Sequence, residues 1–513
     1  MMGAANPAPN SHPQTPVDVC IDVEGCYPFI SGGVSSWLDW LIRSLPEVTF
    51  GVVAITADLR TRTQVYPFPP NVRFLQVLPL TPPAQRPGLS EPLINNDWLV
   101  DIMFRVLRDG DVDAFAELAA MVASPVRRAP FAWARMASAP TYSELLGSGT
   151  AWRAMLRTYQ RLCPQASFSD FFWAWRSLVG GLFALLTAPI PAAKSYHAIS
   201  TGYAGLFTAR AALQSGRRAA ITEHGIYTNE RRIDIIMAEW INDTIKTELA
   251  SMDQRTDVRD FWIQSFESYS RIAYAAAAEI TTLYGENQAM QRALGAKEAK
   301  LRVIPNGIDL AKFDAMPPAA KNRPPTVALI GRVVPIKDIQ AFIAASAIIR
   351  REIPNVEILI LGPTDEDQAY FDMCEKAVEE LGLSETIQFT GKVNIFDYMS
   401  RIDVLVLTSI SEAQPLVLLE AGAARIACVA TDVGSCRDII EGMAGESPSL
   451  GSGGRVVPPM DTDAIGAAVV ELLQDKDLRR RCGEVLRARV ATHFTSAKSA
   501  SQYLNLYSDL ISA

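Results

Sequence analysis

Short apolar runs rich in Val, Ile and Leu recur along the chain, and longer segments with helical spacing separate them. This alternation is typical of parallel sheets that are covered by helices on both faces. A single hydrophobic core does not grow to 513 residues, so more than one domain is expected. The sequence therefore predicts an α/β protein with two doubly wound sheets.

The first half of the chain predicts one sheet with an insertion. Its strand candidates are residues 17–23, 50–55, 72–77, 196–200, 219–223 and 278–283. Between about 85 and 190 the regular spacing is lost, and the stretch is rich in Ala, Trp and Arg. We expect inserted helices there. The uncharged run 177–193 is slightly short for a membrane span and contains two glycines and two prolines, which argues against a transmembrane helix.

The second half repeats the same rhythm more regularly. Its strand candidates are residues 326–332, 356–362, 386–391, 403–409, 427–432 and 454–459. Their spacing suits one doubly wound domain. VIPNGID (303–309) and the proline-rich 314–325 read as the linker between the halves. Residues 1–16 lack the basic and apolar regions of a signal peptide, and we expect a disordered tail.

Composition narrows the classes of partner and cofactor. The net charge is −8 and no long Lys/Arg run is present, so nucleic acid is not expected as a partner. The seven cysteines are odd in number and scattered, which favours reduced thiols in a cytoplasm over disulfides or zinc. With only four histidines, a His-rich metal site is not expected either.

The stretch GRVVPIKD (331–338) follows the first strand of the second half. Arg332 and Lys337 would stand at the carboxyl edge of a parallel sheet, where ligands of open α/β folds bind. Two cations suit a diphosphate. The alternative is a pair of solvated charges on a loop, and the position at the strand end favours the ligand.

The stretch SISEAQPLVLLE (409–420) places two carboxylates around an apolar run. Pro415 suits the first position of a helix, because it lacks an N–H group and its φ is fixed. Glu412 would then lie in the loop before this helix and Glu420 within it, both able to face one cleft. Glu pairs at this spacing also arise by chance, and the spacing alone does not decide between a functional pair and a chance pair.

Two stretches of the first half also lie after strands. In YPFISGGVSSW (27–37), Gly32 and Gly33 permit close approach to the backbone, and the helix that follows offers free N–H groups. In TEHGIYTNER (222–231), His224 could bond a hydroxyl group of a ligand. A simple turn and a structural histidine are the alternatives.

Taken together, GGVSSW, PNGID, GRVVPIKD and SEAQPLVLLEAGAA resemble family 4 glycosyltransferases of the GT-B fold. The resemblance covers nearly the whole chain from Val17. It implies two Rossmann-like domains with the active site in the cleft between them: an acceptor domain over 17–305 with the helical insertion 85–190, a nucleotide-sugar domain over 306–493, and a C-terminal helix over 494–513 that crosses back. Within this family, the chain is similar to the subgroup that acts in Pel exopolysaccharide synthesis.

The resemblance also implies roles for individual residues. Arg332 and Lys337 would neutralise the donor diphosphate, and Glu420 would accept hydrogen bonds from the ribose. The family often has Gly-Phe after its first Glu, whereas this chain has Ala413-Gln414, which bears on the contacts to the donor sugar. The remaining implied contacts are Glu412 and His224 at the reacting sugar, Gly33 at the diphosphate, and the helix start at Gln414, Pro415, Leu416 and Val417 at the sugar or the distal phosphate.

The activity implied is a retaining, metal-independent transfer of a hexose from UDP-glucose or another UDP-hexose to a saccharide acceptor, with no cofactor. No DxD motif stands where a metal-dependent transferase would carry it. The implied location is the cytoplasm, peripheral at the inner membrane through membrane-bound Pel synthase components. Two alternatives share this architecture: a nucleotide-sugar epimerase, and a catalytically silent subunit of a polysaccharide synthase complex.

Overall fold

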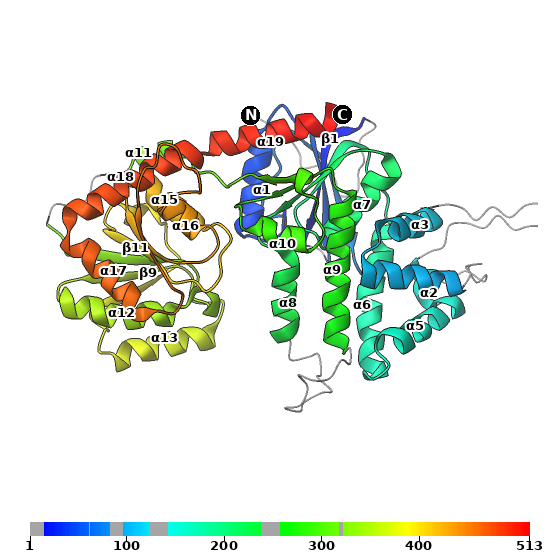
Figure 1. Ribbon diagram of the computed structural model, residues 1–513, viewed down its shortest axis with the longest axis horizontal. Coiled ribbons are helices and arrows are strands. Elements are labelled where there is room, and N and C mark those ends of the chain that lie inside the picture. Colours follow the sequence, from blue (N-terminus) through cyan, green and yellow to red (C-terminus); the bar gives the residue numbers. More distant parts are fainter. Residues whose placement is uncertain are drawn as a thin grey trace, which may run out of the picture. The chain divides into compact units, whose positions relative to one another are not determined.

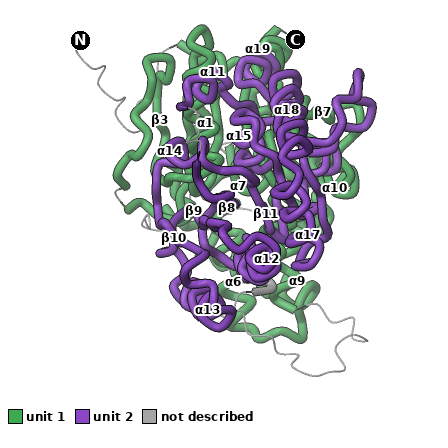
Figure 2. The backbone as a smooth tube through the Cα atoms, turned by 90° about the vertical axis from the view of Figure 1, so that its left-hand side faces the viewer, with its two compact units in different colours: residues 1–282, 287–303, 503–513 green, residues 283–286, 304–502 purple. Residues whose placement is uncertain are grey.

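The computed structural model describes residues 15–60, 62–82, 96–123, 142–237, 257–317 and 322–512. Residues 1–14, which make up most of the expected tail, lie outside this described part. The chain divides into two compact units, coloured separately in Figure 2. Unit 1 comprises 1–282, 287–303 and 503–513, and unit 2 comprises 283–286 and 304–502.

Unit 1 is built on a parallel sheet with the strand order β3-β2-β1-β4-β5-β6-β7. The predicted strands are all present, and a short edge strand, β7, joins them. It was not anticipated, because three residues, Leu-Arg-Val, are too few to show a strand periodicity. The strands are β1 (Val17–Glu24), β2 (Phe50–Thr56), β3 (Val72–Pro79), β4 (Ala193–Ala198), β5 (Ala219–Glu223), β6 (Glu279–Thr282) and β7 (Leu301–Val303).

Helices cover this sheet (Figure 1). Several of them follow β3 and precede β4 along the chain, in the predicted insertion. Parts of the insertion, 85–95 and 124–141, fall outside the described residues. The described insertion contains α2 (Asn96–Phe104), continued by a π-helical turn (Arg105–Asp109), α3 (Val112–Ala123), α4 (Tyr142–Gly147), α5 (Gly149–Leu162) and α6 (Phe168–Thr187). The other α-helices in the described part of unit 1 are α1 (Gly33–Ser44), α7 (Tyr203–Ser215), α8 (Tyr227–Met237), α9 (Val258–Ala276) and α10 (Asn287–Ala293).

The apolar helix α6 is explained by its surroundings. Its residues from Leu178 to Leu186 are all buried, and it packs against α4, α7 and α9. Ser167 begins the helix by accepting a hydrogen bond from the N–H of Asp170, a standard N-cap. Of the helices in the described ranges, none has the length and apolarity that a bilayer crossing requires.

Unit 2 contains a parallel sheet with the strand order β10-β9-β8-β11-β12-β13. Its strands are β8 (Thr326–Ile330), β9 (Glu357–Leu361), β10 (Ile387–Gly391), β11 (Val404–Leu407), β12 (Ala427–Thr431) and β13 (Gly454–Val457). One apolar cluster joins the sheet to α12 (Ile339–Glu352), α13 (Gln368–Glu380) and α17 (Thr462–Gln474). A second joins it to α11 (Leu310–Asp314), α14 (Phe396–Met399), α15 (Leu416–Ala423), α16 (Cys436–Ile440) and α18 (Lys476–His493).

The two sheets share a topology that indicates where ligands bind. In each, the first strand of the unit (β1 or β8) lies beside the fourth (β4 or β11), and the strand order reverses at that pair. Ligands of open α/β sheets bind outside the carboxyl ends of the strands at such a switch point. The last helix, α19 (Ser496–Ser512), is divided between the units, and its residues from Tyr503 onward belong to unit 1.

Candidate functional site

An ion pair stands at the switch point of unit 2. Lys337 lies in the loop after β8 and Glu412 in the loop after β11, and Nζ of Lys337 is 2.5 Å from Oε1 of Glu412. The hydroxyl of Ser409 donates to the same carboxylate oxygen at 2.6 Å. Both charged residues are separate candidates in the sequence, and the structure joins them.

The loop that carries Glu412 is fixed by its neighbours. The hydroxyl of Thr408 donates to the carbonyl oxygen of Lys337 at 2.8 Å, and the N–H of Ser435 donates to the carbonyl oxygen of Ala413 at 2.9 Å. Gly434 has a φ of 53°, and a Cβ there would lie 2.2 Å from the carbonyl oxygen of Glu412. Glycine alone fits such a close approach, so the loop after β12 holds the Glu412 loop in place.

Arg332 is more exposed to solvent than Lys337. Its side chain is 56% exposed and pairs with Glu366 at 2.7 Å. An exposed ion pair contributes about 1 kcal/mol or less, so a ligand phosphate can replace Glu366 at small cost. Arg332 is thus a cation available at the same strand end as Lys337.

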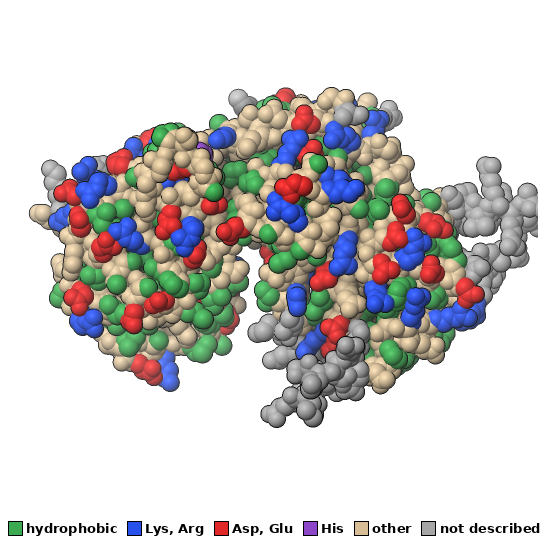
Figure 3. Space-filling model, in the orientation of Figure 1, with side chains coloured by type: hydrophobic (Ala, Val, Ile, Leu, Met, Phe, Trp, Pro, Cys, Tyr) green, Lys and Arg blue, Asp and Glu red, His purple; other side chains and the backbone are tan. Residues whose placement is uncertain are grey.

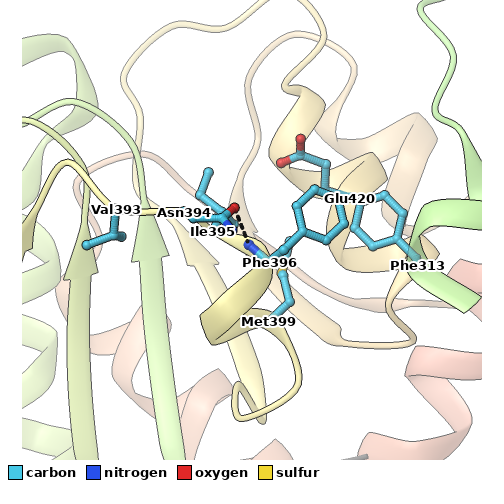
Figure 4. A pocket seen from close by; sticks show the side chains of 7 residues that line it. All are labelled: Phe313, Val393, Asn394, Ile395, Phe396, Met399 and Glu420. Atoms are coloured by element: carbon cyan, nitrogen blue, oxygen red, sulfur yellow. Dashed lines mark hydrogen bonds between the residues drawn. The ribbon is translucent and has the colours of Figure 1, made fainter. Parts of the chain in front are cut away.

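Glu420 lines a pocket of about 250 Å³ in unit 2. The rings of Phe313 and Phe396 lie together beside its carboxyl group, with their centroids 4.9 Å apart (Figure 4). Burial raises the pKa of Glu420 to about 7. The pocket is lined by Phe313, Val393, Asn394, Ile395, Phe396, Met399 and Glu420.

The side chain of Gln414 points into the protein. Its Oε1 accepts a hydrogen bond from the N–H of Asn306 at 2.7 Å, which ties the PNGID segment to the start of α15. Nε2 of Gln414 and Oδ1 of Asn306 are both buried, and neither has a hydrogen-bond partner among the residues that the structure describes. Asn306 was expected only to form a turn.

Helix α15 begins one residue later than predicted. Pro415 is its N-cap, with a φ of −72° and a ψ of 111°, and Leu416 is the first helical residue. The extended ψ of Pro415 keeps it out of the helix. No side chain caps α15, so the N–H groups of Leu416 and Val417 remain available to a ligand oxygen.

Gly33 and His224 belong to unit 1. Gly33 is the first residue of α1, and a Cβ there would meet nothing within 4 Å, so the space beside Gly33 is open. His224 follows β5, and burial lowers the pKa of its imidazole to about 4, which keeps the ring neutral. Its Nε2 is buried and finds no partner in the described ranges.

The strand ends of unit 1 also carry two carboxylates that the sequence analysis did not single out. Glu223 ends β5 and accepts hydrogen bonds from four donors: the hydroxyls of Thr201 and Tyr274, the amide of Gln291 and the N–H of Tyr227. Glu24 ends β1 and accepts from the N–H of Tyr203 at 2.9 Å and the hydroxyl of Tyr227 at 3.0 Å. Burial raises the pKa of both carboxyls.

Phe313 and Phe396, which form the aromatic wall of the Glu420 pocket, were not predicted from the sequence. The rule that ligands bind at strand ends could have found Phe396, since it closely follows β10.

In the part of the chain that the structure covers, no group of three or more His, Cys, Asp and Glu side chains is placed to hold a metal ion. On the face drawn in Figure 3, basic and acidic side chains are interspersed.

Comparisons with known proteins divide the chain as the structure does. A model described as "Domain of unknown function (DUF3492)" matches residues 17–299, and "Glycosyl transferases group 1" matches 313–489. N-acetyl-alpha-D-glucosaminyl L-malate synthase of Bacillus anthracis is 30% identical over 177 residues, which cover 34% of this chain and 43% of the relative. The chain spans about half the length of the curated relatives it matches.

Solved structures show the same fold. Sucrose-phosphate synthase from Thermosynechococcus elongatus has a TM-score of 0.56 and 18% identity over 96% of this chain and 99% of its own. Anabaena Alr3699/HepE in complex with UDP-glucose has a TM-score of 0.54 and 13% identity over 96% of this chain and 99% of its own. Both units are therefore Rossmann-like domains of the GT-B type. The chain belongs to the DUF3492 family, with a glycosyl transferases group 1 domain in its second half.

Proposed function

We propose that the protein is a retaining, metal-independent glycosyltransferase that moves a hexose from a UDP-hexose, with UDP-glucose as the leading candidate, to a saccharide acceptor. The observation that carries this proposal is the segment Glu412–Glu420. Its first carboxylate meets the strand-end cation Lys337, and its last lines an aromatic pocket. One loop and one helix thus supply groups for both ends of a nucleotide sugar.

The pocket at Glu420 suits the nucleoside. Its wall of Phe313 and Phe396 offers apolar surface to a base, and few polar groups interrupt it. The carboxyl of Glu420 has no hydrogen-bond partner among the described side chains and can accept from ribose hydroxyls. An ionised carboxylate accepts more strongly than a neutral group, so binding is expected to favour the ionised form.

The diphosphate would lie at the carboxyl end of β8. Lys337 and Arg332 supply positive charge there, and the open N–H groups of Leu416 and Val417 supply the start of a helix, where anions are stabilised. Fixed cations stabilise the charge that develops on a departing diphosphate. This is the basis for proposing that transfer does not depend on a metal.

In the proposed reaction, the bond between the anomeric carbon and the distal phosphate oxygen breaks while the acceptor oxygen bonds to the same carbon. The acceptor hydroxyl loses its proton to the departing phosphate, so charge and atoms balance. When UDP displaces Glu412 from Lys337, the freed carboxylate can bond hydroxyls of the donor sugar. His224, neutral because burial lowers its pKa to about 4, is proposed to bond a hydroxyl of the reacting sugar.

The more specific proposal is a PelF-type role in Pel exopolysaccharide synthesis, with membrane-bound Pel synthase components as partners and a cytoplasmic location. The resemblance of the segments around Gly33, His224 and Glu412 supports it, and all seven cysteines are free thiols, as in a reducing compartment. The UDP-glucose complex of Alr3699/HepE, which has the same fold, supports the choice of donor for testing.

The proposal is tested by incubating the protein with UDP-glucose, other nucleotide sugars and saccharide acceptors, with and without EDTA. We expect release of UDP and a product with the α-configuration of the donor, at a rate that EDTA does not change. Epimerised donor without transfer would favour the epimerase alternative. Failure to bind any nucleotide diphosphate would favour the silent subunit.

A further inference from the structure

Two histidines of unit 1, the buried His197 and the partly buried His224, are held in different ways. His197 lies in β4, and both of its ring nitrogens have hydrogen-bond partners: Nδ1 lies 2.9 Å from the hydroxyl of Tyr507 and Nε2 lies 2.8 Å from that of Thr222. For His224, no hydrogen bond from either ring nitrogen is found to any residue in the described part of the chain. Hydrogen bonds therefore fix the ring of His197 but not that of His224.

An aromatic contact takes the place of these hydrogen bonds. The indole of Trp37, in the second turn of α1, meets the imidazole of His224 edge to face, with ring centroids 4.3 Å apart. Such arrangements are favourable beyond the area that they bury. Trp37 is in turn backed by Tyr503 of α19, with ring centroids 5.5 Å apart, and Tyr503 is fully buried. The indole of Trp37 thus packs between Tyr503 of α19 and His224.

The contact leaves polar atoms without partners. Nε1 of Trp37 and Nε2 of His224 are both buried, and no described residue bonds them. Trp37 as a whole is 6% exposed. Unpartnered buried polar groups are costly and are retained where a ligand or water completes them. One of them belongs to α1 itself and the other to the ring that packs on it, and the Cβ position of Gly33, at the start of the same helix, is open.

We infer that Trp37 is a positioning residue, which holds the imidazole of His224 in the orientation that presents Nε2 to the substrate. This inference rests on the proposed function, because it needs a reaction in which His224 takes part. Trp37 itself does not touch the reacting atoms. Without its ring, the imidazole would turn about its χ angles, since no described hydrogen bond restrains it.

The test uses three variants of the full chain. Trp37→Leu removes the ring, and Trp37→Phe keeps a ring that can pack edge to face. Trp175→Leu is the matched control, because Trp175 is buried to the same degree, at 7% exposed, in the helical insertion. If Trp37→Leu does not fold, Trp37→Met takes its place, since Met fills similar space without a ring.

The first readout is NMR titration of labelled histidines, of which the chain has only four. In the wild type, His224 is expected to titrate near 4 and His197 near 3, both lowered by burial, with the charge of His224 contributing at His197. Trp37→Leu should raise the pKa of His224 towards its ordinary value of 6.5, because more of the ring becomes accessible to water. Trp37→Phe and Trp175→Leu should leave it low.

The second readout is transfer. A misplaced catalytic group costs up to about 100-fold in rate, so Trp37→Leu should lower kcat by about 10- to 100-fold. KM for the donor and UDP affinity should change less than about threefold, since the nucleotide groups lie in unit 2. Trp37→Phe should restore most of kcat. A His224 titration unchanged by Trp37→Leu would overturn the inference, and so would equal losses of kcat in Trp37→Leu and Trp175→Leu.

The two readouts separate this inference from the proposed function. If the wild type transfers no sugar from any donor, the proposed function fails, and the contact of Trp37 with His224 then has no role in catalysis. The titration still reports whether Trp37 fixes and shields His224. If the wild type transfers sugar and Trp37→Leu retains full kcat, only the inference fails.

Discussion

The two sheets have the same strand order at their switch points, but the charged side chains there differ in how far the protein itself satisfies them. In unit 1, the carboxylate of Glu223 is fully occupied by four hydrogen-bond donors of the protein itself. In unit 2, Lys337 and Glu412 are each partly exposed, at 21% and 14%, and Arg332 is more exposed still. Equal topology therefore does not assign equal function to two strand edges.

This difference shows how to distinguish structural from functional charges. A buried charge whose bonds are all made within the protein stabilises the fold, and it has nothing left to offer a ligand. A charge at a strand end with a weak or replaceable partner can exchange that partner for a ligand. In the described part of unit 1, the neutral ring of His224 and the N–H groups at the start of α1 still have hydrogen bonds to offer a ligand. Unit 2 offers two cations, a carboxylate and a pocket.

The largest effect expected from this comparison is on stability in unit 1. Glu223→Ala strands four buried donors and should cost about 3–5 kcal/mol, which lowers the midpoint of thermal unfolding by about 10 °C. Glu223→Gln keeps one acceptor oxygen and should cost less. The control in unit 2 is Glu412→Ala, which breaks a pair that is only partly exposed and should cost about 1–2 kcal/mol. Equal shifts from Glu223→Ala and Glu412→Ala would break the comparison.

The next effect is on nucleotide binding in unit 2. Lys337→Ala should weaken the binding of UDP by about 10- to 100-fold in calorimetry, the scale for losing a hydrogen bond to a charged group. Arg332→Ala should fall at the lower end of this range because of its exposure. Arg401→Ala is the matched control, since Arg401 pairs with Glu357 at the start of β9, at the opposite edge of the same sheet. An equal loss in the control would remove the assignment of the site.

A smaller effect is expected from pH. The pKa of Glu420 is raised to about 7, so about a tenth of the carboxyl is ionised at pH 6 and most of it at pH 8. If the ionised form binds ribose, UDP affinity should rise by about tenfold over this range, beyond the titration of the phosphate itself. Glu420→Gln isolates the carboxyl, because the phosphate still titrates in the variant. The same pH dependence in both proteins would contradict the ribose contact.

The smallest effect concerns Gln414. Gln414→Ala leaves the buried N–H of Asn306 without its acceptor and should cost about 1–2 kcal/mol of stability. Gln388→Ala, at an exposed position of β10, should cost less than about 0.5 kcal/mol. Thermal unfolding of the two variants measures the difference. A neutral Gln414→Ala would mean that the hydrogen bond to Asn306 is not needed to hold the loop.

The sequence predicted the sheets and helices because their apolar periodicity is strong, and it predicted the strand-end cations because position on a parallel sheet is a topological property. It did not predict that Lys337 and Glu412 pair, since 75 residues separate them along the chain. Packing between distant segments also determines three other features: the inward side chain of Gln414, the ring contact of Trp37 with His224, and the aromatic wall to which Phe313 contributes. No local pattern carries that information.

The most direct test of the functional assignment of unit 2 is a crystal structure of the protein with UDP. We expect the base against Phe313 and Phe396, the ribose hydroxyls on Glu420, and the diphosphate on Lys337 and Arg332, with Glu412 released from Lys337. UDP bound elsewhere, with the Lys337–Glu412 pair intact and the Glu420 pocket unfilled, would contradict the account.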